Sequence, residues 1–140
     1  MERPSKFDFY IRFKALFNEN GRFIDYILVE VSENFSIATK MNSDRVLGLK
    51  LADLAYDVVN PILGLKDFHY HMLPNTKRKF EHYVKEVNRW YYVNLFSDKD
   101  DYLMMMYTDI SKLKEESIDS YIAEFKNNGE MEYRKKANWL

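Results

Sequence analysis

The stretch YLMMMYTDISKLKEE, from Tyr102 to Glu116, changes character halfway along its length. Six of its first seven residues are apolar or aromatic, and after Asp109 the chain soon becomes rich in lysine and glutamate. The first part has the composition of a strand, and beyond Ser111 apolar residues return at helical spacing. The sequence therefore predicts a strand that passes into a helix without a flexible linker. The apolar helical positions are Ile118, Tyr121, Ile122 and Phe125.

Alternation along a strand places successive side chains on opposite faces of a sheet. The strand that ends at Asp109 alternates in this way, and so does the strand that begins at Arg89. One face of this pair carries Tyr91, Val93, Leu95, Leu103, Met105 and Tyr107. The opposite face carries Trp90, Tyr92, Asn94, Phe96, Tyr102, Met104 and Met106.

Three further segments have strand character. Residues 12–17 and 23–31 are separated by the turn sequence NENG, which predicts a hairpin. Residues 79–87 alternate and precede the two strands described above. Two strands at the front and three at the back predict one five-stranded antiparallel sheet.

Short helical patterns lie between the front and back strands. Ser32 and Ser43 are predicted N-caps of two of them. Residues 51–59 have the apolar spacing of a helix face, Asn60 and Pro61 are expected to break the pattern, and residues 62–73 are expected to resume it. The predicted fold class is therefore α+β, with short helices across one face of the sheet and a C-terminal exit helix.

Composition excludes several classes of protein. The chain has 140 residues, of which 46% are hydrophobic and 31% charged, which is typical of one soluble domain with extensions. A net charge of -1 gives no general attraction to nucleic acid or to membranes, and we expect no contact with either. No apolar stretch is long enough to span a bilayer and no signal peptide is evident, so we expect a cytoplasmic location. The absence of cysteine excludes disulfides, thiolate metal sites and a cysteine-flavin adduct.

The two halves of the pattern together resemble the PAS domain, a sensor module of bacterial and eukaryotic signalling proteins, over about residues 10–116. The opening NENGRFIDYILVEVSENFSIATKMNSDRVLGLKL is similar to the family's turn, strand end and first helices, and RWYYVNLFSDKDDYLMMMYTDISKLKEE is similar to its W-Y-x-V strand and D-I-T-x-x-K-x-x-E exit. Lys40 stands where a glycine is common, so the end of the first helix is expected to follow a different path. Ser111 replaces the usual threonine. The resemblance implies an N-terminal extension over 1–9, a PAS domain over 10–110 and a C-terminal helical extension over 111–140.

By resemblance to flavin-binding members of the family, the face that contains Tyr107 points into a cavity beneath the helices. The implied ligand pocket consists of Leu54, Ile62, Phe68, Met72, Tyr91, Val93, Leu95, Leu103, Met105 and Tyr107. Hydroxyls of Tyr91 and Tyr107 would be available to an unknown small molecule; alternatively, these residues only fill the core. No cofactor is firmly predicted. Haem would require His69 or His71 as the iron ligand, and we expect neither haem nor flavin.

The outward face would leave an unusually large apolar patch if nothing covered it. The candidate covers are residues 7–13, the C-terminal helix and a second copy of the chain. We expect a symmetric homodimer in which a terminal helix and the partner chain together cover this face. Its predicted residues are Trp90, Tyr92, Phe96, Tyr102, Met104 and Met106.

Catalytic signatures are missing from the sequence. It contains no GxSxG, HExxH or phosphate-loop pattern and only four glycines, so we expect a regulatory domain and not an enzyme. The resemblance implies a sensory and dimerisation module whose last strand relays a change through Asp109 and Ser111 into the exit helix. The effector outside this chain would be a diguanylate cyclase, a histidine kinase or a transcription regulator. Two alternatives remain, a ligand-free dimerising scaffold and a small isomerase-like enzyme.

Overall fold

The computed structural model describes residues 5–57, 59–65, 77–99 and 101–117. The chain divides into two units, residues 1–109 and 110–140. The first unit contains the sheet and the short helices, and residues 111–117 of the second unit are helical. The expected helical positions from Ile118 onward lie outside the described residues.

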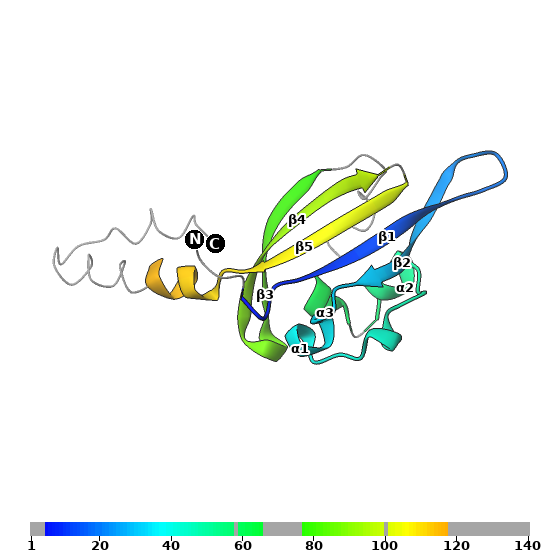
Figure 1. Cartoon of the computed structure of the whole chain (residues 1–140). Coiled ribbons are helices and arrows are strands. Elements are labelled where there is room, and N and C mark those ends of the chain that lie inside the picture. Colours follow the sequence, from blue (N-terminus) through cyan, green and yellow to red (C-terminus); the bar gives the residue numbers. More distant parts are fainter. Residues whose placement is uncertain (1–4, 58, 66–76, 100, 118–140) are drawn as a thin grey trace. The chain divides into compact units, whose positions relative to one another are not determined.

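Five antiparallel strands form one sheet in the order β2-β1-β5-β4-β3 (Figure 1). The last strand therefore lies in the centre, between the first strand and the fourth. This arrangement confirms the predicted five-stranded antiparallel sheet. The strands are β1 (Phe9–Phe17), β2 (Phe23–Val31), β3 (Arg78–Val84), β4 (Arg89–Lys99) and β5 (Tyr102–Asp109).

Three short α-helices follow β2, and Figure 1 shows them gathered on one side of the sheet. Each of them is too short to be stable alone, so their stability comes from the apolar side chains that they bury against the strands. The α+β class with helices across one face is confirmed. The helices are α1 (Phe35–Thr39), α2 (Leu51–Ala55) and α3 (Asn60–Leu63), and the 3-10 turns are η1 (Ser43–Arg45) and η3 (Lys85–Val87).

Both predicted serine caps are wrong, because an asparagine takes the N-cap position in each case. Ser32 lies at the end of β2, where its hydroxyl accepts from the Tyr10 N–H at 3.1 Å and its own N–H donates to the Tyr10 carbonyl at 3.0 Å. The N-cap of α1 is Asn34. The cap of η1 is Asn42, whose side chain accepts from the Asp44 N–H at 3.0 Å.

The helix predicted over residues 51–59 is shorter than expected, and α2 ends at Ala55. Pro61 does not break a helix but lies in the first turn of α3, where proline is tolerated because its missing N–H would have no partner. Gly64 then ends α3 with a left-handed backbone, φ 69°. Residues 66–73 of the predicted second helix lie outside the described part of the chain.

Lys40 ends α1 with a left-handed backbone, φ 61°, and its N–H donates to the Ser36 carbonyl at 2.9 Å. Glycine adopts this conformation without the steric cost that a side chain imposes. The helix end therefore has the left-handed turn that favours a glycine, and the different path expected there stays a prediction.

Candidate functional site

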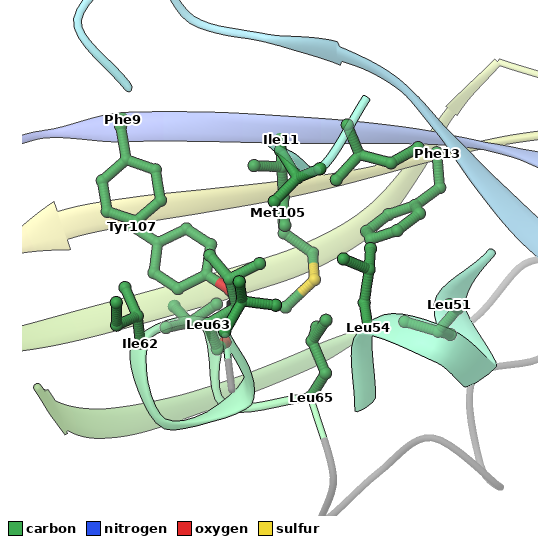
Figure 2. Packing of buried hydrophobic residues seen from close by; sticks show 14 of the residues in the cluster. Phe9, Ile11, Phe13, Leu51, Leu54, Ile62, Leu63, Leu65, Met105 and Tyr107 are labelled. Atoms are coloured by element: carbon green, nitrogen blue, oxygen red, sulfur yellow. Dashed lines mark hydrogen bonds between the residues drawn. The ribbon is translucent and has the colours of Figure 1, made fainter. Parts of the chain in front are cut away.

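The inward face of the sheet carries the predicted pocket residues. Phe9, Ile11 and Phe13 of β1 lie beside Met105 and Tyr107 in Figure 2, with Leu54, Ile62 and Leu63 beneath them. The predicted inward orientation is confirmed, and the role of these residues in ligand binding remains a prediction. Those in the described chain are all buried: Leu54, Ile62, Tyr91, Val93, Leu95, Leu103, Met105 and Tyr107. Phe68, Met72, His69 and His71 lie outside it.

Phe9 is the centre of an aromatic cluster that the sequence analysis missed. Its ring stacks on Tyr107 with centroids 4.3 Å apart, and it meets the edges of Tyr91 at 5.4 Å and Phe35 at 5.8 Å. The cluster therefore joins three strands to α1. The signal that was available is the alternation of Phe9, Ile11 and Phe13, which extends the predicted strand toward the N-terminus.

The hydroxyls of Tyr91 and Tyr107 already have partners. Tyr91 donates to the Phe7 carbonyl at 3.0 Å, and Tyr107 donates to the Leu63 carbonyl. Burial raises the pKa of both phenols, and the charge of Asp109 raises that of Tyr91 further, so both remain protonated donors at neutral pH. Their protons are therefore committed to the protein, and each hydroxyl offers a ligand only its acceptor capacity.

Tyr26 is a second residue that the sequence analysis missed. It is 1% exposed, and its hydroxyl has no hydrogen-bond partner in the described part of the chain. Its ring lies against Phe23, with centroids 4.8 Å apart, and against Phe13 at 6.1 Å. Burial raises the pKa of the phenol to about 12. An unsatisfied buried hydroxyl is unfavourable, and this one keeps both its donor and its acceptor capacity unused.

We expect Tyr26→Phe to leave stability unchanged or to raise it by up to about 1 kcal/mol, because it removes an unsatisfied buried hydroxyl. Tyr107→Phe is the matched change and should lower the free energy of unfolding by about 1–3 kcal/mol, because it leaves the Leu63 carbonyl without its donor. Urea unfolding followed by circular dichroism measures both. A loss of more than 1 kcal/mol in Tyr26→Phe would show that its hydroxyl has a stabilising partner.

The junction at the end of β5 is held by polar groups from two other segments. The Asp109 carboxylate accepts from the Ser5 hydroxyl at 3.0 Å and from the Arg89 guanidinium at 2.9 Å, and both bonds use the same oxygen, Oδ2. The Asp109 N–H donates to the Asp8 carboxylate at 2.7 Å. The Asp109 side chain is only 7% exposed, whereas its partner Arg89 is 30% exposed, so these bonds are partly buried. The structure thus places one predicted relay residue in a network with Ser5, Asp8 and Arg89, which were not predicted.

The outward face of the sheet is partly covered by its own neighbours. Met106 is 45% exposed and Tyr92 36%, whereas Trp90, Phe96, Tyr102 and Met104 are half-buried. The Arg12 guanidinium lies over the Tyr102 ring at 4.2 Å. Residues 9–13 of the candidate cover 7–13 belong to β1, and Phe9, Ile11 and Phe13 are buried on the inward side, so this segment contributes to the outward face only through alternate side chains such as Arg12.

Two surface hollows lie along β3, one of about 440 Å³ beside Gly64 and one of about 680 Å³ that reaches Asn94, Phe96 and Ser97. Lys77, Arg78 and Lys79 line both hollows, so the lining of both is basic. Within the described ranges, no group of three or more histidine, aspartate or glutamate side chains is arranged to hold a metal ion. No helix there has the length and apolar character to cross a membrane.

The sheet therefore has β5 at its centre, between β1 and β4, and the short helices lie on one face. The chain is similar in structure to the PAS domain of an HTR-like protein from Haloarcula marismortui, with 17% identity, a TM-score of 0.43, and coverage of 74% of this chain and 86% of that one. It is also similar to a Rhodobacter sphaeroides LOV protein, with 12% identity, a TM-score of 0.44, and coverage of 98% and 81%. No protein-family model and no curated protein matches the sequence.

Proposed function

We propose that the chain is a sensory and dimerisation module that relays a change in its core to an effector outside this chain. The network at Asp109 is the observation that carries the proposal. The last residue of the central strand is held by three groups at the point where the strand ends, and helical residues 111–117 follow after one residue, Ile110. A change in these bonds would alter where the strand stops and how the following helix begins.

The input to this module would come from the core. A small molecule that packs among the inward residues would have to displace side chains such as Met105, since the inward face is fully buried. Methionine is an adaptable filler, and the Tyr26 hydroxyl offers an unused hydrogen bond, so we expect a neutral or weakly polar ligand. In the ligand-free alternative, partner packing alone supplies the change. Native mass spectrometry of protein purified from cells separates these readings, because a retained molecule supports the first and a clean apo mass supports the second.

The outward face would bind a second copy of the chain. Met106 and Tyr92 are the most exposed of the predicted interface residues, and both lie on β5 and β4, inside the sheet, where a symmetric partner can pack face to face. We propose that Met104 and Met106 lie inside this interface. The effector remains a proposal from the family resemblance: a diguanylate cyclase, a histidine kinase or a transcription regulator.

The combined variant Met104→Glu with Met106→Glu tests the dimer. We expect light scattering to give a dimer mass for the wild type and a monomer mass for the variant, because two carboxylates cannot be buried in an apolar interface. Ile24→Glu is the control, since Ile24 is 56% exposed on β2 and should leave the mass unchanged. A monomeric wild type would contradict this part of the proposal.

A further inference from the structure

The N-terminal turn Ser5–Asp8 contacts Tyr91 of the aromatic cluster around Phe9, and it also contacts Asp109 at the end of β5. Tyr91 also lies opposite Asp109 in the β4–β5 pairing. We propose that movement of the Tyr91 hydroxyl in the core nevertheless reaches Asp109 through this turn. The inference rests on the proposed relay function and adds the route that the relay takes. It gives a positioning role to residues that precede the sheet.

The turn is closed by its own hydrogen bonds. The Asp8 N–H donates to the Ser5 carbonyl at 3.0 Å, and the Ser5 N–H donates to the Asp8 carboxylate at 3.2 Å. The Ser5 hydroxyl also accepts from the Phe7 N–H at 3.1 Å. Because these bonds link both ends of a four-residue segment, the turn should move as one body.

The core side of the turn is held by two elements. The Tyr91 hydroxyl donates to the Phe7 carbonyl at 3.0 Å. The Asn34 amide, from the N-cap of α1, donates to the Lys6 carbonyl at 2.9 Å and also to the Asp8 carbonyl. The carbonyls of the turn are therefore bound by the sheet and by the helical layer at once, so a shift of the Tyr91 ring must move the turn or break a shielded hydrogen bond.

The other side of the turn completes the central strand. The β1–β5 register ends at Phe9 and Tyr107, and the next position on that side of β5 is Asp109. There the chain before β1 has turned away, and the Asp8 carboxylate accepts the Asp109 N–H in place of a strand carbonyl, at 2.7 Å. The Ser5 hydroxyl holds the Asp109 carboxylate as well. The last bond of β5 on this side therefore depends on a side chain of the turn.

Arg89 contacts both the turn, at Phe7, and the end of β5, at Asp109. Its guanidinium lies 3.4 Å from the centroid of the Phe7 ring and forms the 2.9 Å ion pair with Asp109. The same planar group can bond a carboxylate through its edge and stack on an aromatic ring through its face. Displacement of Phe7 would therefore also disturb the ion pair, which couples the turn to Asp109 by a second contact.

Hydrogen exchange at the Asp109 amide, measured by NMR on the intact chain, tests this route. Asp8→Ala should speed that exchange by about five- to tenfold relative to the nearby β5 amides, because it removes the acceptor. Asp8→Asn keeps an acceptor oxygen and should restore most of the protection. Unchanged exchange in Asp8→Ala would overturn the assignment of the turn as the support of Asp109.

Tyr91→Phe tests the connection to the core. It should speed exchange at the Asp109 amide severalfold in the wild-type background and add nothing in the Asp8→Ala background, because both changes act on one path. Tyr107→Phe is the matched control, since its hydroxyl is bonded to Leu63 and not to the turn. An equal Tyr91→Phe effect in both backgrounds would show that the signal crosses directly from β4 to β5 and would overturn the proposal.

These experiments need neither ligand, dimer nor effector. The route through the turn can therefore fail while the proposed sensory function stands. A monomeric wild type with a clean apo mass would remove the functional proposal and leave the measured coupling between Tyr91 and Asp109 intact.

Discussion

Phe9→Ala is expected to lower the free energy of unfolding by about 3–5 kcal/mol, the range for removing a fully packed aromatic ring. The ring is buried between Tyr107, Tyr91 and Phe35, so its loss opens a cavity and removes one stacked and two edge contacts. These partners belong to β5, β4 and α1, so the cavity can close only if one of these three elements moves. Urea unfolding followed by tryptophan fluorescence measures the change.

Phe17→Ala is the matched control at the other end of β1. Phe17 is 42% exposed and touches only the edge of Phe23, with centroids 6.2 Å apart, among the ring contacts of the described chain. We expect a loss of less than about 1 kcal/mol. Equal losses at the two positions would contradict the central place of the Phe9 cluster in the core.

Periodicity predicted the sheet well because it is a local signal. The alternation of Leu103, Met105 and Tyr107 gave the correct inward face, and every one of these residues is buried. The start of β1 was placed too late, at Arg12, although Phe9 continues the same alternation. Ser5 and Asp8, which were also missed, belong to the segment before the strand, where sequence gives little sign of how the chain will meet the rest of the fold.

Contacts between distant segments could not be predicted from local pattern. Asp109 was predicted as the junction, but its partners Ser5 and Asp8 are 104 and 101 residues away in sequence. The same limit explains Ser32, whose hydroxyl has the chemistry of a helix cap but is used by Tyr10 of the neighbouring strand. In both cases the register of the sheet decides which polar group is within reach, and that register is set only when the strands pair.

Met105 and Met106 form a natural test of the two faces of β5. Met105→Ala should lower the free energy of unfolding by about 2–5 kcal/mol, because Met105 is fully buried and its removal leaves a cavity. Met106 is 45% exposed, and Met106→Ala should cost the monomer less than about 0.5 kcal/mol. The substitutions are chemically identical and adjacent in sequence, so local propensity cannot explain a difference between them. Thermal and urea unfolding measure both variants.

Protein concentration separates folding from association in this pair. If the outward face binds a second copy, the unfolding midpoint of the wild type depends on protein concentration. Only folded chains form the dimer, so a higher concentration shifts the folding equilibrium toward the folded state by mass action. Met106→Ala should weaken that dependence while leaving the low-concentration value nearly unchanged. Met105→Ala should lower stability at every concentration, since Met105 lies on the inward face. If Met106→Ala instead destabilises the chain equally at all concentrations, Met106 is packed within its own chain, and the outward face cannot be assigned to a partner through that residue.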